Sequence, residues 1–573
     1  MRKILSFLKP YPLAMVIAWV LMLLELVVEL THPIFMGKII DQGIMKEDMG
    51  AVSYWGLIMI GMSLLGFIAG IINSFVSSHV SQSFGFDVRA GLFKKVQSFS
   101  FHNLAQYETS SLITRLTNDI TQVQNTIHMS LRIAFRAPLL VIGAIAMALI
   151  VNWKLALILV VPIPLLIVLL VWMMSRSGKL FKQVQNKLDK VNNVMQENLI
   201  GMRLVKAFRR KEFEENRFNT ANTNLRNETM KALRLVELVG PTLLFVMNIG
   251  ILLIIWFGSF EVNQNGLLVG ELVTLINYGF RITAALGMLT WITMAFARGR
   301  ASAQRISEVL NTEEDFENNN IPSTTSKIRY GKVDFENVSF TYPGTNTPVL
   351  QDISFTVEAG DRVAVMGATG SGKSTLFQLI PRLYDTTKGC IRIDGIDIRK
   401  MDLKTLRKQM GFVPQEAILF TGSVKENISW GKDDATMEEI IESMEDAQIY
   451  ETIKRLPNTY ETKIGQKGVN FSGGQKQRLS IARALIRKPK LLFLDDSTSA
   501  LDMRTEAKLL QALDKFDCTT FIITQKITTA KAADQILLLD EGRLVANGSH
   551  DSLLATSELY KAIYQSQNAK EVL

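Results

Sequence analysis

A glycine-rich segment in the second half of the chain carries the residue types that bind phosphate. Residues 367–375 read Gly-Ala-Thr-Gly-Ser-Gly-Lys-Ser-Thr and match the pattern G-x-x-x-x-G-K-[ST]. In such a loop, backbone N–H groups surround the phosphates, the lysine neutralises their charge and the last hydroxyl reaches Mg²⁺. We expect ATP contacts from every residue of this loop: Gly367, Ala368, Thr369, Gly370, Ser371, Gly372, Lys373, Ser374 and Thr375.

Two further segments follow this loop. Phe471-Ser472-Gly473-Gly474-Gln475 comes about a hundred residues later, and the apolar run 491–494 ends in Asp495 and Asp496. A continuous apolar run is typical of a buried parallel strand, and a carboxylate at its end can hold hydrated Mg²⁺. Asp495 is therefore expected to be a magnesium ligand. The three segments in this order predict that the chain binds ATP.

Composition indicates that the ATP-binding half is joined to a membrane protein. The chain has 573 residues, 48% of them hydrophobic, and the long apolar runs lie almost entirely in the first 300 residues. The formal charge of +9 does not indicate a nucleic-acid partner. Residues 175–234 carry 14 Lys and Arg against 6 Asp and Glu, between membrane segments, which is typical of a cytoplasmic loop. A solvated, charged helix face is also compatible with this count.

Six segments are long and apolar enough to cross about 30 Å of hydrocarbon at about 1.5 Å per residue. Three of their connections are short, whereas those over about 78–130 and 175–237 are long and show helical periodicity. We therefore expect helices that continue out of the bilayer, with the long connections and both termini in the cytoplasm. The N-terminal segment is interpreted as a retained helix and not as a cleaved signal. The six predicted spans are Pro12–Thr31, Trp55–Val76, Pro138–Val151, Leu155–Met174, Leu238–Gly258 and Leu267–Phe296.

Charged and polar residues inside these spans form a candidate substrate pathway. Glu25 and Glu29 share one face of the first span, and Asn277 and Arg281 repeat that spacing on the sixth. Ionisable groups in a membrane are costly and usually face a bundle interior or a water-filled cavity. Two interpretations stay open: a polar pathway whose carboxylates attract cationic substrates, and Glu–Arg pairs that fix helix packing.

The predicted fold is an α-helical transmembrane bundle with long cytoplasmic extensions, fused to an α/β P-loop ATPase domain with a helical subdomain. We expect the transmembrane domain at 1–310, a linker at 311–330 and the nucleotide-binding domain at 331–573. Within the latter, Val333–Phe340 and Arg362–Met366 are predicted strands and Lys373–Leu383 a helix. The two cysteines, Cys390 and Cys518, fit a reduced cytoplasmic domain, and we assign them neither a disulfide nor a metal.

The whole chain resembles a half-transporter of the ATP-binding cassette exporters. The resemblance implies that Gln415 touches Mg²⁺ and senses the membrane domain, so that Ser374, Gln415 and Asp495 are the expected magnesium ligands. Tyr342 is similar to the aromatic residue that stacks on adenine, although a lone Tyr is more often ordinary packing. Asp502 lies in a segment similar to the D-loop. The resemblance further implies that residues 108–112 and 202–209 are coupling helices that dock on ATPase domains. The residues similar to the family signature, which caps the partner's ATP, are Phe471, Ser472, Gly473, Gly474 and Gln475.

The chain departs from that family at two positions beside the γ-phosphate. Asp496 stands where the family has a glutamate that polarises the attacking water, and Gln525 stands where it has a histidine. The aspartate carboxylate falls about 1.5 Å short, and a displacement of about 1 Å can lower a rate about 100-fold. Glutamine carries no positive charge and shuttles no proton. Both changes together predict a site that binds ATP and cleaves it slowly. Gln466, where the family usually has Glu, is a milder difference.

An intact signature beside a weakened site suggests unequal partners. We hypothesise that the chain is the degenerate-site subunit of a heterodimeric exporter whose partner half-transporter supplies the missing Glu and His. The alternatives are a nucleotide-gated membrane regulator and a homodimeric exporter. Apolar helices, a few acidic residues and 24 methionines are compatible with a small amphipathic or cationic substrate. Lipids and peptides stay open as alternatives. We expect a multi-pass protein of the cell membrane, with the lipid bilayer as its surroundings, ATP and Mg²⁺ as cofactors and no nucleic acid.

Overall fold

The computed structural model describes residues 2–264, 266–313 and 327–568. The chain forms two compact units, Met1–Gln97 with Glu108–Thr312, and Ser98–Tyr107 with Glu313–Leu573. This differs from a division at residue 310, because Ser98–Tyr107 packs with the second unit. Its helix α4 (Phe101–Ala105) is capped by Ser100, and the Phe101 ring contacts Tyr384 of the ATPase half at 6.0 Å between centroids.

The first unit consists of long helices. Six helical stretches among its described residues are long and apolar enough to cross a membrane, with 35 to 53 residues each. At about 1.5 Å per residue, a 49-residue helix such as α3 measures about 74 Å, more than twice the hydrocarbon thickness. Each predicted span overlaps one of these stretches. The six stretches are Pro12–Lys46, Met49–Gln97, Thr109–Val151, Trp153–Ile200, Lys211–Asn263 and Val269–Asn311.

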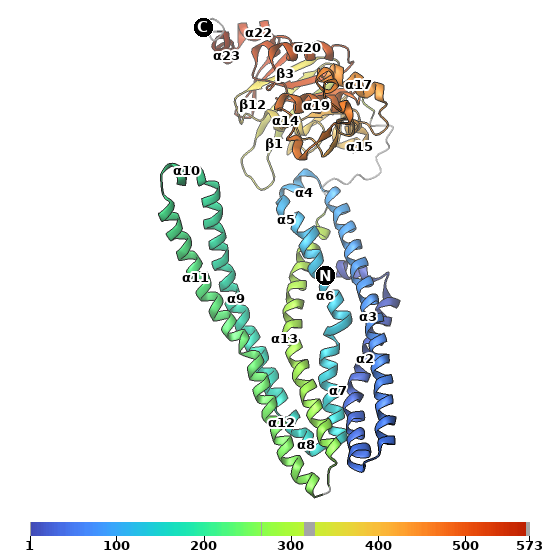
Figure 1. The fold of residues 1–573 in the computed structure, drawn as a ribbon. Coiled ribbons are helices and arrows are strands. Elements are labelled where there is room, and N and C mark those ends of the chain that lie inside the picture. The colour runs from blue at the N-terminus through green and yellow to red at the C-terminus, as the bar shows by residue number, and fades with distance from the viewer. Residues whose placement is uncertain (1, 265, 314–326, 569–573) are drawn as a thin grey trace. The chain divides into compact units, whose positions relative to one another are not determined.

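Short irregular turns subdivide these stretches (Figure 1). Asn152 lies between the third and the fourth stretch. It caps helix α8, since its side chain accepts a hydrogen bond from Leu155 N–H. The elements are α1 (Arg2–Leu5), η1 (Ser6–Leu8), α2 (Pro12–Lys38), η2 (Ile39–Gly43), η3 (Ile44–Lys46), α3 (Met49–Gln97), α5 (Thr109–Thr114), η4 (Arg115–Asp119), α6 (Ile120–Met129), η5 (Ser130–Ala134), α7 (Arg136–Val151), α8 (Trp153–Val160), α9 (Pro162–Ile200), α10 (Met202–Ala207), α11 (Lys211–Glu237), α12 (Val239–Asn263) and α13 (Val269–Asn311).

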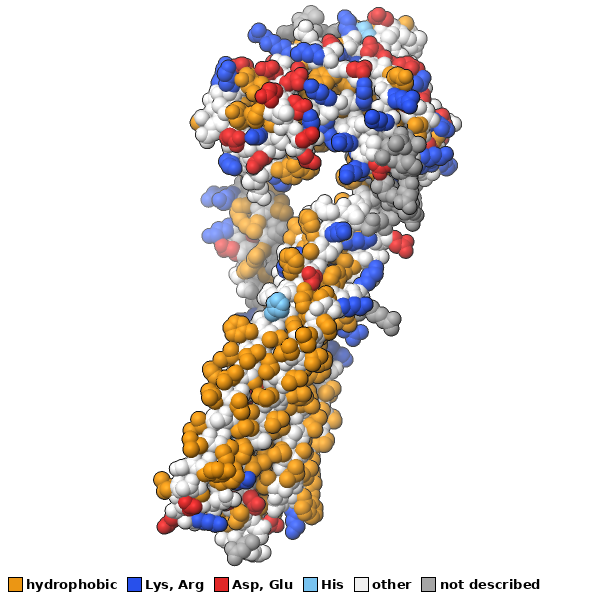
Figure 2. All heavy atoms as spheres, turned by 90° about the vertical axis from the view of Figure 1, so that its right-hand side faces the viewer, with side chains coloured by type: hydrophobic (Ala, Val, Ile, Leu, Met, Phe, Trp, Pro, Cys, Tyr) orange, Lys and Arg blue, Asp and Glu red, His pale blue; other side chains and the backbone are white. Residues whose placement is uncertain are grey.

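Helices α2 and α13 are joined by polar contacts near a proline. Pro33 lies inside α2 and has no N–H to donate, which weakens the helix locally. The Thr274 hydroxyl donates to Pro33 O at 2.9 Å, and the Tyr278 hydroxyl donates to Leu30 O at 2.7 Å. These bonds join the two helices through polar groups in an apolar environment. Large apolar side chains cover much of the surface of this unit (Figure 2), as a lipid-facing surface requires.

The second unit is built on a six-stranded sheet. Its strand order is β12-β11-β3-β10-β9-β6, and every neighbouring pair except β11–β12 is parallel. A four-stranded sheet of order β2-β1-β4-β5 and a short β7–β8 pair complete it. The strands are β1 (Val333–Phe340), β2 (Leu350–Val357), β3 (Arg362–Gly367), β4 (Lys388–Ile393), β5 (Ile396–Asp397), β6 (Met410–Val413), β7 (Gly422–Ser423), β8 (Lys463–Ile464), β9 (Leu491–Asp495), β10 (Thr519–Ile523), β11 (Gln535–Asp540) and β12 (Arg543–Gly548).

Three apolar clusters lie in the described part of the ATPase half, and the smallest packs helices α21, α22 and α23 against the large sheet. One of the two larger clusters lies between the two sheets and helix α14 and includes Phe377, Phe493 and Phe521. The other, which includes Ile440 and Leu479, holds a helical subdomain together. The helices are α14 (Lys373–Leu379), α15 (Leu403–Lys408), α16 (Val424–Ser429), α17 (Met437–Asp446), α18 (Tyr450–Lys454), α19 (Gly473–Leu485), α20 (Met503–Leu513), α21 (Ile527–Lys531), α22 (His550–Thr556) and α23 (Glu558–Asn568), with the short η7 (Ile398–Lys400), η8 (Thr459–Glu461) and η9 (Gln466–Gly468).

Sequence reasoning placed the two predicted strands correctly and overestimated one helix. Helix α14 ends at Leu379, not at Leu383. Pro381 explains the earlier end, because a proline has no backbone N–H to donate and so cannot continue the helical hydrogen bonds.

Candidate ATP-binding site

The phosphate loop joins β3 to α14 at the carboxyl edge of the parallel sheet. In the sheet register, Ile523 pairs with both Val365 and Asp495, so the ends of β3, β9 and β10 lie side by side. Ligands of open α/β sheets bind at this edge. The three strands are short, largely apolar and buried along almost their whole length, which is typical of a parallel sheet covered on both faces.

Glycines make the loop possible. Gly367 has φ 148°, and a Cβ there would lie 2.1 Å from Leu539 O, so no larger residue fits. Gly370 and Gly372 have φ 86° and 95°, in the left-handed region that glycine adopts without cost. Gly370 has open space around it, where a phosphate can approach the backbone.

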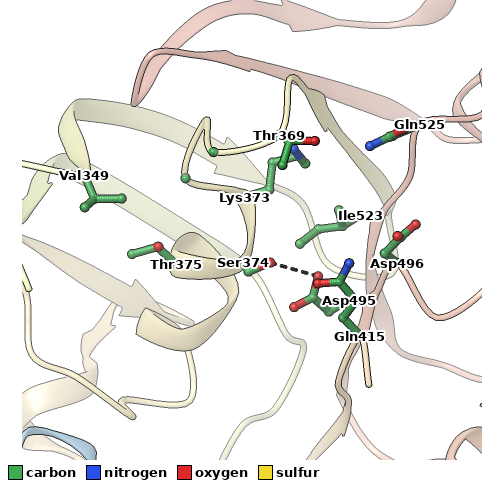
Figure 3. A pocket seen from close by; sticks show the side chains of 12 residues that line it. Val349, Thr369, Lys373, Ser374, Thr375, Gln415, Asp495, Asp496, Ile523 and Gln525 are labelled. Atoms are coloured by element: carbon green, nitrogen blue, oxygen red, sulfur yellow. Dashed lines mark hydrogen bonds between the residues drawn. The ribbon is translucent and has the colours of Figure 1, made fainter. Parts of the chain in front are cut away.

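Lys373 and Ser374 point into a pocket of about 270 Å³ beside the loop. The Lys373 ammonium donates to Gly367 O at 2.9 Å and to Ala368 O at 2.6 Å, so it stands along the loop that would surround the phosphates. The Ser374 hydroxyl donates to Asp495 Oδ1 at 3.1 Å (Figure 3). The residues lining the pocket are Val349, Thr369, Gly370, Gly372, Lys373, Ser374, Thr375, Gln415, Asp495, Asp496, Ile523 and Gln525.

Burial changes the ionisation of the charged groups in this pocket. It lowers the pKa of the Lys373 ammonium, although Asp495 and Asp496 oppose this. Burial also raises the pKa of the Asp495 carboxyl, against the Ser374 hydrogen bond, and raises the pKa of the Asp496 carboxyl, against the charge of Lys373. Each pKa shift is in the direction that loss of hydration produces. A ligand that carries both negative and positive charge would therefore stabilise the charged forms of the lysine and of the two aspartates.

The donor set fits magnesium and ATP. A hydroxyl from Ser374, a carboxylate from Asp495 and the amide of Gln415 offer oxygen atoms, the ligand type that Mg²⁺ prefers beside substrate phosphates. Among the described residues, no group of three or more His, Cys, Asp and Glu could hold a metal ion. A magnesium site here would therefore depend on phosphate oxygens as well as on protein ligands.

The two positions that differ from the expected pattern both face the pocket. Figure 3 shows Asp496 and Gln525 on one side of the phosphate loop and Val349 on the other. Asp496 has a left-handed backbone with φ 46°, which aspartate tolerates better than most residues. Gln415, which lines the same pocket, opposes the rise in the pKa of the Asp496 carboxyl group.

The signature residues lie away from this pocket. Ser472 caps α19 in a reciprocal capping box, in which its hydroxyl accepts from Gln475 N–H and Gln475 Oε1 accepts from Ser472 N–H at 2.9 Å. A Cβ on Gly474 would lie 2.9 Å from Ala500 O. Phe471, Ser472, Gly473, Gly474 and Gln475 are absent from the pocket lining. One chain therefore brings the phosphate loop and the strand-end carboxylates together but does not bring the signature to them.

Tyr342 belongs to an aromatic cluster beside the pocket. Its ring lies 5.4 Å from Tyr384 and 4.9 Å from Phe340, and its hydroxyl lies 3.0 Å from the Thr375 hydroxyl. The cluster continues from Tyr384 to Phe101 of α4. These contacts are those of ordinary packing, and stacking on adenine stays a prediction.

Asp502 caps the helix that follows β9. Its side chain accepts from Thr505 N–H at 2.9 Å and from the Thr505 hydroxyl at 2.7 Å.

Among the residues that line the pocket, sequence reasoning missed Val349 and Ile523. An apolar residue in or next to a strand gives no separate signal of a binding site.

The charged residues predicted to lie inside the spans, Glu25, Glu29 and Arg281, form one cluster with Arg136, which sequence reasoning did not name. Arg136 of α7 donates to Glu25 and to Glu29, each at 2.7 Å, and Arg281 lies 3.1 Å from Glu29. The Asn277 amide instead donates to Val273 O at 3.0 Å. Two arginines thus balance two glutamates. The pairing supports the packing interpretation, and no sequence pattern linked Arg136 to the first helix.

Comparisons with known proteins match both halves of the chain. A family model described as "ABC transporter transmembrane region" matches residues 15–285, and one described as "ABC transporter" matches residues 350–499. The uncharacterized ABC transporter ATP-binding protein YfiB of Bacillus subtilis is 53% identical over 571 residues, covering 100% of this chain and 99% of that protein.

The chain belongs to the ABC transporters. It is also 34% identical over 587 residues to a Bacillus subtilis protein described as the probable multidrug resistance ABC transporter ATP-binding/permease protein YheI, covering 99% of this chain and 97% of that one. A solved structure of a bacterial Atm1-family ABC exporter with ATP bound superposes with a TM-score of 0.79 at 26% identity, over 97% of this chain and 98% of that one.

These matches confirm the predicted fold class, a six-helix transmembrane domain fused to an α/β ABC ATPase domain. They also establish an ATP-driven ABC exporter subunit, a multi-pass membrane protein of the half-transporter type, whose members work as dimers. A dimer accounts for the separation of signature and phosphate loop, since a second chain can supply what one chain lacks.

Proposed function

We propose that this chain is the slowly hydrolysing subunit of a heterodimeric ABC exporter. The observation that carries the proposal is the placement of Asp496 and Gln525 on the lining of the phosphate pocket. A carboxylate that is one methylene too short aims the attacking water poorly, and a neutral amide at the second position neither supplies charge nor transfers a proton.

The rest of the pocket supports retained ATP binding. Lys373, Ser374 and Asp495 have the side-chain types and the proximity that Mg-ATP requires. Ser472 and Gln475 form a well-made helix N-terminus for the ATP of a partner subunit. In this proposal the partner carries the glutamate and the histidine, hydrolyses its own ATP against this signature and resets the transporter.

The transported compound is proposed to be small and amphipathic. One relative, YheI, is described as a probable multidrug resistance protein. The Glu25, Glu29, Arg136 and Arg281 cluster is balanced in charge, so apolar packing would select the substrate more than attraction of cations. The basic excess of residues 175–234 supports a cytoplasmic ATPase half in the cell membrane.

Hydrolysis by the purified chain tests the proposal. The wild-type chain in lipid nanodiscs is expected to bind Mg-ATP and to hydrolyse it at a rate close to that of a Lys373→Ala control, which measures background. Asp496→Glu with Gln525→His should raise the rate about 100-fold, as restored positioning of the water predicts. Vigorous vanadate-sensitive turnover by the wild-type chain alone would contradict the proposal and favour a homodimeric exporter.

Transport separates the proposal from a nucleotide-gated regulator. Inverted vesicles containing the chain and its partner should accumulate an amphipathic dye only when ATP is hydrolysed. Passage of the dye with a non-hydrolysable ATP analogue would support gating without pumping.

A further inference from the structure

Helix α23, the last in the described part of the chain, contacts the backbone beside Gln525. Thr524–Ile527, which we call the switch segment, connects β10 to α21. Gln567 of α23 uses both ends of its side-chain amide on this segment: Nε2 donates to Gln525 O at 2.6 Å, and Oε1 accepts from Ile527 N–H at 3.0 Å. The two bonds hold the peptide units on either side of Lys526.

This contact replaces a missing helix cap. Ile527 is the first residue of α21, and the first N–H groups of a helix have no partner within it. Lys526, at the N-cap position, makes no capping hydrogen bond through its side chain. Gln567, 40 residues later in the chain, supplies the acceptor instead. Glutamine suits this role because one neutral side chain offers both a donor and an acceptor.

Helix α23 is anchored firmly enough to position the segment. Tyr560 is fully buried, and its hydroxyl lies 2.8 Å from His550 Nδ1. Ile563 and Tyr564 pack against the apolar cluster that also contains Ile527. The same cluster therefore supports α23 and the helix that Gln567 caps.

The other side of the switch segment is also held. Lys526 Nζ donates to Glu506 Oε2 at 2.5 Å, and Glu506, which is buried, accepts from the Thr529 hydroxyl at 2.8 Å. The Lys526 side chain is thus paired with Glu506 of α20, whereas Gln525 lines the phosphate pocket. The backbone bond from Gln567 acts on the residue whose side chain faces the nucleotide.

We propose that Gln567 is a positioning residue for the nucleotide site, and that the C-terminal helix α23 sets how Gln525 meets the γ-phosphate. This inference rests on the proposed function, in which Gln525 occupies the position that reads that phosphate. Loss of the Gln567 contact releases the Gln525 peptide, so discrimination between ATP and ADP falls while contacts with the α- and β-phosphates persist.

The experiment measures Mg-ATP and Mg-ADP affinities of the full chain in nanodiscs. Gln567→Ala should weaken Mg-ATP binding about three- to tenfold, the worth of one net hydrogen bond, and leave Mg-ADP binding unchanged. Gln567→Glu keeps the acceptor for Ile527 N–H and loses the donor to Gln525 O, so it should weaken Mg-ATP binding similarly. Gln565→Ala, an exposed position of the same helix, is the matched control and should equal wild type.

Two further measurements make the outcome decisive. Hydrogen exchange of the 524–531 segment should accelerate in Gln567→Ala and not in Gln565→Ala. Gln525→Ala should lower the ATP-to-ADP preference as well, and adding Gln567→Ala to it should cause no further loss, because a positioning residue acts only through the residue it positions. An unchanged preference in Gln567→Ala, or an equal loss of both nucleotides, would overturn the inference. If Gln525→Ala alone leaves the preference unchanged, the role assigned to Gln525 fails as well.

Discussion

Ser374 and Asp495 lie 121 residues apart in the chain, and the Ser374 hydroxyl donates to the Asp495 carboxylate at 3.1 Å. Ser374 lies in the first turn of helix α14, and Asp495 ends strand β9. Their contact joins the phosphate loop to the carboxylate expected to hold magnesium. The pair places the first turn of a helix and the end of a strand where both could bind one magnesium ion beside the phosphates.

Removing the hydroxyl should affect ATP binding only when magnesium is present. Ser374→Ala is expected to weaken Mg-ATP binding roughly tenfold, since hydrogen bonds to charged groups are among the stronger ones. Binding of ATP in excess chelator should stay the same. Ser374→Thr, which keeps the hydroxyl, is the control. Calorimetric titration with and without Mg²⁺ measures both, and equal losses in the two conditions would contradict the magnesium role.

The Tyr342 ring is expected to bind adenine. Tyr342→Ala should lower ATP affinity by about 1–3 kcal/mol, the usual contribution of base–aromatic stacking. Tyr342→Phe should bind almost as wild type, because it keeps the ring and loses only the hydroxyl contacts with Thr375 and Gln378. Fluorescent ATP titration distinguishes the variants. If Tyr342→Phe loses as much affinity as Tyr342→Ala, the hydroxyl network and not the ring carries the effect.

The charge cluster of the membrane unit should contribute to stability. Arg136→Met leaves Glu25 and part of Glu29 without a partner, and breaking a buried pair costs about 3–5 kcal/mol. The Arg136 and Glu25 side chains are 28% and 22% exposed, so we expect about 1–3 kcal/mol here.

A second substitution checks the cause. Glu25→Gln added to Arg136→Met should recover part of the loss, because the unpaired carboxylate disappears. Thermal unfolding in nanodiscs, followed by tryptophan fluorescence, measures each variant. Equal unfolding temperatures for Arg136→Met and wild type would show that the cluster adds no stability.

The two thiols should respond differently to a change at Glu336. Cys390 Sγ donates to Glu336 Oε2 at 3.0 Å, and this hydrogen bond raises the pKa of the Cys390 thiol. Burial raises the pKa of the Cys518 thiol. Glu336→Gln removes the negative charge and leaves Arg392 beside Cys390, so the pKa of that thiol falls and more thiolate is present at pH 8.

Alkylation of Cys390 at pH 8 should therefore become about three- to tenfold faster in Glu336→Gln, because the thiolate fraction rises tenfold for each unit by which the pKa falls. Mass spectrometry of the peptides follows the reaction, and Cys518 in the same sample is the internal control. An unchanged Cys390 rate would contradict the effect of Glu336 on this thiol.

Much of this architecture follows from local sequence signals. The six spans depend on runs of apolar residues, which lipid requires whatever the neighbouring helices do. The phosphate loop at 367–375 depends on glycine conformations and on one lysine within a short segment. The departures from the family pattern at Asp496 and Gln525 can be found from the sequence. Each residue lies within two positions of the end of a strand with a clear apolar pattern.

Tertiary structure decided which distant groups meet. The pairing of Arg136 with Glu25, the packing of Ser98–Tyr107 with the ATPase unit, and the reach of Gln567 to the switch segment leave no periodic signal. Each depends on how helices and strands pack over tens or hundreds of residues. Backbone conformation is set largely by neighbours in sequence, whereas ion pairs and capping by distant side chains exist only once packing has placed both partners.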